Sequence, residues 1–115
     1  MKYMLLINSE EAGYAKMSEA DMGQLMAAYG QFDKEINAAG ACLGSHRLQP
    51  TSAATTVRVR DGESLITDGP FAETKEQFGG YYLVEVKDLD EAIQWAAKIP
   101  SAKYGSVEVR PVWEM

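Results

Sequence analysis

The chain of 115 residues, 46% hydrophobic and 24% charged, predicts one globular domain over residues 1–115. Its formal net charge of −6, with no basic run, excludes nucleic acid as a non-specific partner. No apolar run approaches the ~20 residues that a membrane span needs, and the short apolar run at the amino terminus does not fit a signal peptide. Cys42 is the single cysteine, so no internal disulfide forms, and we expect a cytoplasmic protein.

The first third of the chain predicts one strand followed by one long helix. Residues 3–7 form a short apolar strand, and the polar residues 8–17 predict a loop. Ser18 fits a helix N-cap with acidic residues in the next turn, and Gly40 fits a left-handed C-terminal cap. Between these two caps, apolar side chains recur every three or four residues, at Met22, Leu25, Tyr29, Phe32 and Ile36. We therefore expect a helix over residues 18–39.

The middle of the chain predicts extended structure. Residues 41–48, closed by Pro50, form a short strand or an extended arm. Residues 55–60 alternate valine with arginine, which predicts a strand with one apolar side. An Asp-Gly pair at residues 61–62 gives a strong hairpin-turn signal before a second apolar stretch at residues 65–66.

The most informative segment is residues 67–82, here called the 67–82 block. It holds three acids, one lysine, three glycines, one proline and four aromatic side chains. Long connections with a fixed conformation and mixed chemistry often carry function, so we expect a site here. A strand over residues 81–86 follows the block.

The last third predicts a helix and a final strand. Asp88 caps this helix, with Glu91 in a capping-box position, and Pro100 blocks its continuation. Residues 107–112 alternate valine with charged residues and form the last strand.

The resulting order is β-α-β-β-α-β, with the segment 41–48 as an extra arm after the first helix. This order predicts an α+β fold of the ferredoxin-like type. Two helices cover only one face of such a sheet, and an uncovered apolar face usually finds a partner subunit. We therefore expect a homodimer.

Residues 68–76, which read Asp-Gly-Pro-Phe-Ala-Glu-Thr-Lys-Glu, and the following Gly-Gly-Tyr-Tyr-Leu at 79–83 resemble the signature of the DGPF proteins in the YCII-related superfamily. The similarity extends over essentially the whole chain and includes residues 1–7, 48–50, 88–92 and 107–112. The resemblance implies a dimeric α+β barrel made by two subunits packed sheet to sheet. It also implies relatives that act on muconolactone-type compounds and frequent association with extracytoplasmic-type sigma factors.

The chain departs from the YCII pattern at the histidine–aspartate pair that YCII proteins are thought to use. The stretch 27–30 of the first helix contains no histidine, and Ile99 stands where that pattern has an aspartate before proline. The pair carried over from the resemblance is therefore absent.

His46, the single histidine, is the candidate for proton transfer, with Asp68 as an orienting carboxylate. The alternatives are that His46 is a surface or pocket-lining residue and that Asp68 only fixes the turn before Pro70. His46 and Cys42 do not complete a zinc site, so we expect no metal and no cofactor.

Further ligand-binding candidates are Phe71, Glu73, Lys75, Tyr82 and Arg58. Phe71 either plugs the core or lines a pocket, and the charged residues either recognise a polar substrate or form a solvated surface. The charged side chains of residues 58, 60, 108 and 110 are expected to meet on the helix-free face of the sheet. There they either bind a small organic acid between subunits or form ion pairs that fix the dimer register.

Two functions follow from these observations. One is a dimeric small-molecule-binding protein or enzyme, such as a lyase or isomerase acting on a small organic acid, with a pocket between the sheet and the 67–82 block. The alternative is a non-catalytic regulatory module that works with a sigma factor. A pocket lined by Asp68, Tyr82 and arginine favours the first, whereas a packed interior with an exposed apolar groove favours the second.

Overall fold

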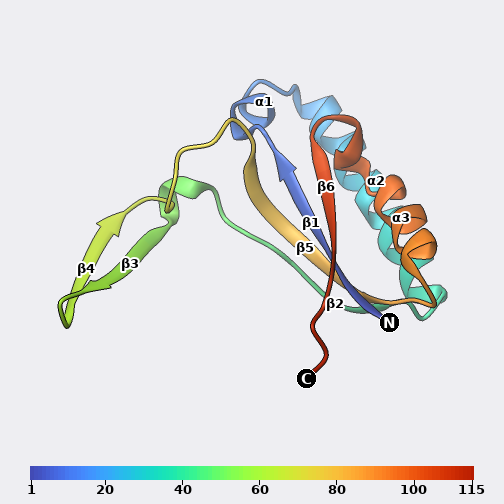
Figure 1. The fold of residues 1–115 in the computed structure, drawn as a ribbon. Helices are drawn as coiled ribbons and strands as arrows, with labels where there is room; N and C mark the ends of the chain where they lie inside the picture. Colours follow the sequence, from blue (N-terminus) through green and yellow to red (C-terminus); the bar gives the residue numbers. More distant parts are fainter.

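A four-stranded antiparallel sheet forms the centre of the computed structural model, which describes residues 1–115. Its strands lie in the order β2 (Cys42–Arg47), β5 (Gln77–Glu85), β1 (Lys2–Ser9) and β6 (Ser106–Pro111), as Figure 1 shows. Every neighbouring pair in this sheet runs antiparallel. The architecture is a mixed α+β fold that is compatible with the predicted ferredoxin-like type.

The two long helices, α2 (Glu19–Ala38) and α3 (Leu89–Lys98), cover one face of the sheet (Figure 1). Both predicted N-caps are confirmed: the Ser18 side chain accepts from the Asp21 amide at 3.0 Å, and the Asp88 side chain accepts from the Glu91 amide at 2.9 Å. None of the helices combines the length and apolarity that a bilayer span requires.

The core lies between this sheet face and the helices. Alternation along β1 directs Tyr3, Leu5 and Ile7 toward the helices, and Leu5 is fully buried. Phe32 from α2 meets Tyr82 from β5 edge to face, with ring centroids 5.0 Å apart. Twelve buried residues form one continuous cluster, so a single core holds the domain together.

The prediction of a loop over residues 8–17 was wrong in part. β1 continues to Ser9, and a short helix α1 (Glu11–Ala15) follows it. A 3₁₀ turn η2 (Pro100–Lys103) lies between α3 and β6, near the same end of β1. α1 and η2 therefore bring side chains together at the end of the central strand.

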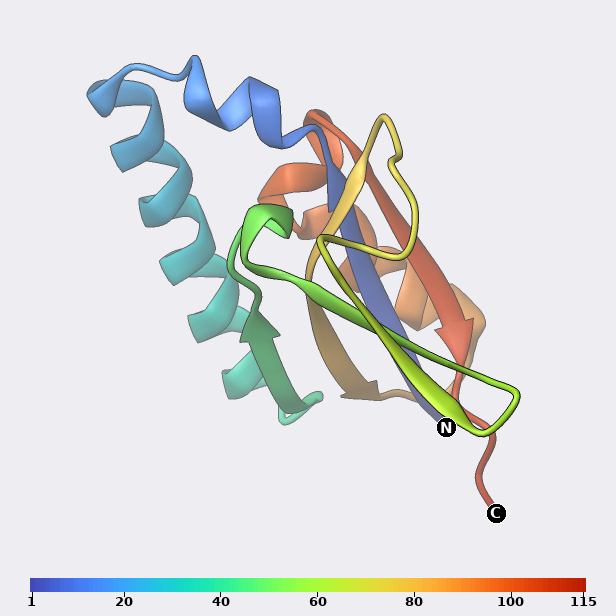
Figure 2. The same cartoon turned by 90° about the vertical axis from the view of Figure 1, so that its left-hand side faces the viewer.

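The largest correction concerns the middle of the chain. The predicted sheet strand at residues 55–60 is β3 (Thr55–Arg60), which pairs only with β4 (Glu63–Asp68) in a separate two-stranded sheet. This hairpin, here called the arm, projects on the side of the sheet away from the helices (Figures 1 and 2). Of the two alternatives for residues 41–48, the short strand is confirmed: they contain the edge strand β2, which pairs with β5 in the main sheet.

The valine–arginine alternation predicts a strand with one apolar side. It does not specify the strand that pairs with it or the surface that covers its apolar side. The Asp-Gly turn was predicted correctly, because Asp61 and Gly62 have φ values of 53° and 79°. Since the arm is separate, its arginines do not meet residues 108 and 110 as expected. Arg58 donates to the Phe71 carbonyl at 3.2 Å, and Arg110 Nε donates to Glu108 at 2.6 Å.

Two glycines of the long helix offer a matched test of the backbone. Gly40 follows α2 with φ of 69°, whereas Gly23 lies inside α2 with open space around the position of a Cβ atom. We expect Gly40→Ala to lower the free energy of unfolding by ~1 kcal/mol and Gly23→Ala to raise it by about 0.5–1 kcal/mol. Urea unfolding of both variants checks the signs, and a gain in stability for Gly40→Ala would contradict the left-handed cap.

Candidate functional site

A cavity of about 720 Å³ lies beside the edge strand β2, between the sheet and the helices α1 and α2. We call it the β2-edge cavity. Apolar side chains line part of it, and tyrosine, serine and charged side chains line the rest. The polar lining includes Ser9, Glu11, Tyr14, Tyr29, Asp33, His46, Arg47, Tyr82 and Ser101.

A chain of hydroxyl groups forms the inner wall of the β2-edge cavity. Ser9 donates to the Tyr14 hydroxyl at 2.9 Å, and that hydroxyl lies 3.0 Å from Ser101 Oγ. The Tyr29 hydroxyl lies 2.6 Å from the same Ser101 oxygen. Ser9 and Ser101 are buried, so these bonds fix two phenol rings at the cavity against the end of β1.

A phenol–carboxylate pair also lines the β2-edge cavity. The Tyr82 hydroxyl donates to Asp33 Oδ1 at 2.6 Å, which joins β5 to α2. Burial raises the pKa of Tyr82 well above its usual range, and the hydrogen bond to Asp33 raises it further. Burial also raises the pKa of Tyr29, although its bond to Ser101 and the charge of Arg47 act in the opposite direction. Both phenols are therefore neutral hydrogen-bond donors near neutral pH.

The charged side chains of the cavity differ in whether they have a partner within the chain. Glu11 accepts hydrogen bonds from the backbone amide and the hydroxyl of Thr51, each at 2.8 Å, and Asp33 accepts from Tyr82. Arg47 also lines the cavity, but it takes part in none of the five ion pairs of the structure. The cavity consequently offers one guanidinium without an internal partner.

His46 lies at the edge of the cavity. Its strand position pairs with Tyr81, and its Nδ1 atom lies 2.8 Å from the Tyr81 hydroxyl. Because successive strand residues point to opposite faces, His46 and Tyr81 lie on the helix-free face, whereas Tyr82 points toward the helices. The bond to Tyr81 occupies Nδ1 and leaves Nε2 of this exposed ring for another partner.

The structure brings together only some of the predicted site residues. His46 and Tyr82 both line the β2-edge cavity, whereas Asp68, Phe71, Glu73, Lys75 and Arg58 lie outside it. Asp68 ends β4, on the arm, and no hydrogen bond joins it to His46. The Phe71 side chain is 78% exposed, so it does not plug the core. Lys75 lies 3.8 Å from Glu10 in an exposed ion pair.

Sequence reasoning missed the residues that give the cavity its chemistry. Tyr29 was read only as part of the apolar helix stripe, and Arg47 and Ser101 belong to no pattern. A tyrosine on a core-facing stripe is itself a signal, because a buried phenol hydroxyl usually needs a partner. That partner, Ser101, is 72 positions away along the chain, beyond any local spacing.

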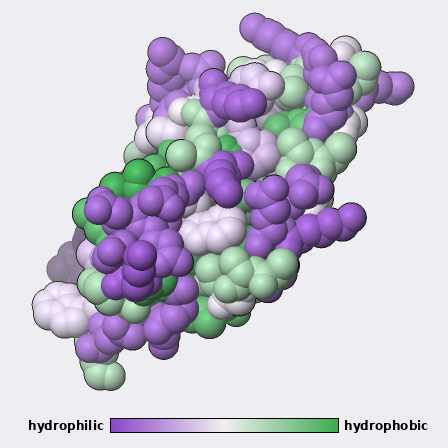
Figure 3. All heavy atoms as spheres, turned by 90° about the vertical axis from the view of Figure 1, so that its right-hand side faces the viewer, coloured by the Kyte–Doolittle hydropathy of each residue, from purple (hydrophilic) through white to green (hydrophobic).

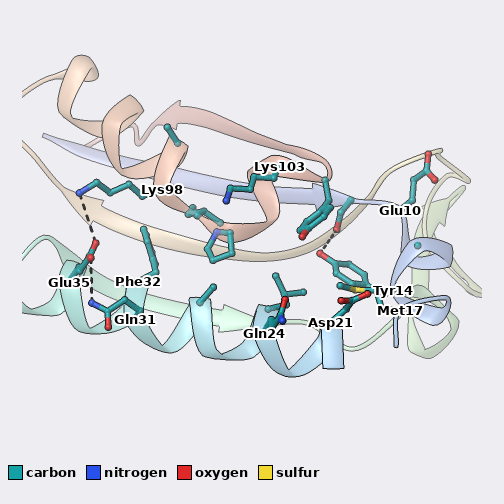
Figure 4. A pocket seen from close by; sticks show the side chains of 18 residues that line it. Glu10, Tyr14, Met17, Asp21, Gln24, Gln31, Phe32, Glu35, Lys98 and Lys103 are labelled. Atoms are coloured by element: carbon teal, nitrogen blue, oxygen red, sulfur yellow. Dashed lines mark hydrogen bonds and ion pairs between the residues drawn. The ribbon is translucent and has the colours of Figure 1, made fainter. Parts of the chain in front are cut away.

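A second hollow of about 1010 Å³ lies between α2 and the segment that runs from α3 into η2 (Figure 4). Lys98 lies 3.9 Å from Glu35 in this hollow, and Gln31 donates to the same carboxylate at 3.4 Å, whereas Asp21 and Lys103 take part in no ion pair. Ser9, Tyr14 and Leu25 line both hollows and separate them. Because the β2-edge cavity holds the predicted site residues His46 and Tyr82 together with the hydrogen-bonded Tyr29, we regard it as the stronger candidate. No cluster of three or more histidine, cysteine, aspartate or glutamate side chains is present to hold a metal ion.

Comparison with known proteins supplies the family. The family model described as YCII-related domain matches residues 1–115. The chain belongs to the YCII-related family. It is also similar to the uncharacterised protein R00369 of Rhizobium meliloti (strain 1021), with 38% identity over 114 residues that cover 97% of this chain and 92% of the relative. Membership of the DGPF proteins within the YCII-related family stays a prediction.

The raised pKa values of the two buried phenols predict a pH dependence of stability. Unfolding releases each tyrosine to its ordinary pKa of ~10, so above that pH the unfolded chain binds fewer protons than the folded protein. The free energy of unfolding should therefore hold below about pH 10 and fall as the pH rises further. Urea unfolding from pH 7 to 11 measures this slope.

The variant Tyr82→Phe isolates one of the two phenols. It should cost ~1 kcal/mol at pH 7, because it leaves Asp33 without its partner, and it should make the alkaline slope shallower. Tyr104→Phe, at a tyrosine that is 65% exposed, is the control and should change neither quantity. An unchanged slope in Tyr82→Phe would contradict the assignment.

Proposed function

We propose that this YCII-related protein is a homodimeric small-molecule-binding protein whose β2-edge cavity takes a small organic acid. The observation that carries the proposal is Arg47, a guanidinium without an internal ion pair, beside neutral buried phenols in a cavity of about 720 Å³. Cavities of this size, with apolar walls and a few convergent polar groups, are typical of small-ligand sites. A pocket of this kind favours ligand binding over the alternative of a non-catalytic module that works with a sigma factor.

The chemistry of the lining favours an anion with an apolar body. Arginine presents a planar fork that matches a carboxylate, and phenol hydroxyls add neutral donors. Leu25, Met26 and Pro50 give the apolar wall. Glu11 and Asp33 keep their negative charges but already accept hydrogen bonds within the chain, whereas Arg47 is the one arginine of the lining and has no internal ion pair.

A catalytic role is proposed in addition to binding, and it concerns two residues. His46 is among the residues that line the cavity, its Nε2 takes part in no hydrogen bond, and it is the proton-transfer candidate, with Asp68 on the arm as the proposed second residue. The Tyr29–Ser101 pair links α2 to the turn after α3, the two segments where the YCII pattern has its histidine and aspartate. A phenol with a raised pKa donates hydrogen bonds and does not act as a base near neutral pH, so this pair supports binding and orientation of a ligand.

The dimer is proposed from the amount of exposed surface. One chain exposes 8052 Å², whereas a compact monomer of 12.6 kDa exposes roughly 6,200 Å². The radius of gyration is 16.1 Å, against ~13 Å for a compact chain of this length. The helices carry a mostly hydrophilic outer surface (Figure 3), so the face of the sheet without helices is the proposed contact. Packing two such faces gives the dimeric α+β barrel.

Ligand binding is tested with benzoate as the probe and benzamide as its neutral counterpart. We expect benzoate to shift backbone amide resonances of residues 45–50 and of Tyr29 in a two-dimensional NMR titration. Arg47→Gln should weaken benzoate binding at least tenfold, because it removes the charge that pairs with the carboxylate, and it should leave any benzamide binding unchanged. Arg60→Gln, at the exposed tip of the arm, is the control.

The same titration tests the predicted residues. Loss of benzoate binding in His46→Ala or Asp68→Asn, with folding intact, would place these residues at the ligand. If both variants bind normally while Arg47→Gln does not, the site is the β2-edge cavity without them. Normal benzoate binding by Arg47→Gln would overturn the proposed site.

The dimer is tested by sedimentation equilibrium at micromolar concentration, where we expect twice the chain mass of 12.6 kDa. Leu6 lies on the helix-free face, since it pairs with Tyr81 and Glu108. Leu6→Lys should therefore give monomers, because it places a charge in the apolar contact. Gln94→Lys on the exposed surface of α3 is the control, and a wild-type monomer at this concentration would refute the dimer.

A further inference from the structure

The arm is a two-stranded ribbon that is unsupported within its own chain. Val57 and Val59 are each 59% exposed, and Ile66 is 69% exposed. An isolated two-stranded hairpin is only marginally stable in water. A ribbon that exposes this much apolar surface needs a surface to cover it.

The register of the arm gives it one apolar face and one polar face. Val57 pairs with Ile66, so these two side chains share one face, and Val59 lies two residues along the same face. The opposite face carries Arg58 and Thr67, together with Leu65. This pattern is that of a half-buried strand pair, whose apolar face expects a packing partner.

The base of the arm is fixed, so its direction is set by the chain. The Gly69 amide donates to the Ala54 carbonyl at 2.7 Å, and the Thr56 hydroxyl donates to the Gly69 carbonyl at 2.7 Å. Arg58 adds a bond to the Phe71 carbonyl. Held in this way, the arm stands on the helix-free side of the sheet (Figures 1 and 2).

We propose that the arm of each chain lies on a second copy of the protein, with the face of Val57, Val59 and Ile66 packed on the partner's helix-free side. The inference rests on the proposed homodimer and adds to it a pair of exchanged hairpins. Each hairpin strand has six residues and reaches ~20 Å, enough to pass beyond the edge of its own sheet.

The size of the uncovered surface favours a second copy as the occupant. One chain exposes about 1,800 Å² more than a compact monomer of its mass, so a pair has roughly 3,700 Å² to bury. That value lies in the range of obligate homodimers and exceeds the ~1,600 Å² of a standard transient complex.

Symmetry and charge agree with this choice. Each chain carries its arm and its uncovered sheet face on the same side, so one two-fold axis satisfies both surfaces of both copies. The charges near the tip cancel, because Arg58 and Arg60 are matched by Asp61 and Glu63. Nothing in the arm therefore selects a strongly basic or acidic partner such as nucleic acid.

The test compares the two faces of the arm in the full-length protein. Val57→Lys and Ile66→Lys should each raise the dimer dissociation constant at least tenfold, measured by sedimentation. Thr67→Lys, on the opposite face of the same hairpin, should change it less than threefold. Hydrogen exchange should show protected amides in residues 55–68 at dimer concentrations, with protection lost on dilution to monomer. All three positions are exposed, and circular dichroism checks that each variant is folded.

The possible results distinguish the proposal for the arm from the proposal for the dimer. If Leu6→Lys gives monomers while Val57→Lys and Ile66→Lys stay dimeric with unprotected arm amides, the arm proposal is overturned and the dimer stands. Protection of the arm that does not change on dilution would show that it packs on its own chain, which also overturns the proposal. A wild-type monomer would overturn both.

Discussion

The sheet is covered on one face only, and this constraint sets the environment of every residue in its strands. The two longer helices, α2 and α3, both lie on the same side of the sheet. The alternation along β1 follows from this: Leu5 is fully buried against the helices, whereas its neighbour Leu6 points to the other face and is half-buried. The same alternation sends Tyr82 into the core and Tyr81 to the uncovered side.

The hydroxyl groups at the end of β1 show how the core tolerates polar atoms there. Tyr14 and Tyr29 converge on the buried Ser101, and no buried side-chain nitrogen or oxygen lacks a hydrogen-bond partner. A buried polar atom without a partner would cost about 1–3 kcal/mol, so the network stabilises the fold and also disfavours other arrangements of these elements. It holds α1, α2 and η2 in a fixed arrangement and thereby shapes the β2-edge cavity. The same hydrogen bonds therefore satisfy the buried polar atoms and position the elements that line the cavity.

Local chemistry predicted the elements but not their partners. Caps at Ser18 and Asp88 and the turn at residues 61–62 were predictable because each depends on neighbours within four residues. The sequence did not predict that β2 joins the main sheet while β3 lies in the separate hairpin. β2 carries few apolar residues and is defined by its hydrogen bonds to β5. Strand pairing over such distances in sequence leaves no short-range signal.

For the candidate site too, local features were predictable from the sequence and long-range contacts were not. The 67–82 block drew attention through its composition, yet its first half lies outside the cavity, while its second half is β5 and supplies Tyr82. Arg47 and Ser101 gain their importance only when α2, β2 and η2 come together. Their side-chain types are common on any surface, so only the folded arrangement distinguishes them.

The two edges of the sheet agree with the proposed association through its face and disfavour growth along its strands. An open edge presents unpaired amides and carbonyls that can recruit another chain. β6 ends at Pro111, which has no amide to donate, and carries the paired charges of Glu108 and Arg110 on the helix-free face. β2 has a register shift between Cys42 and Gly44, which interrupts a regular ladder. With both edges blunted, the helix-free face and the apolar side of the arm are the surfaces left for the proposed partner, and a two-fold contact through them would close on itself.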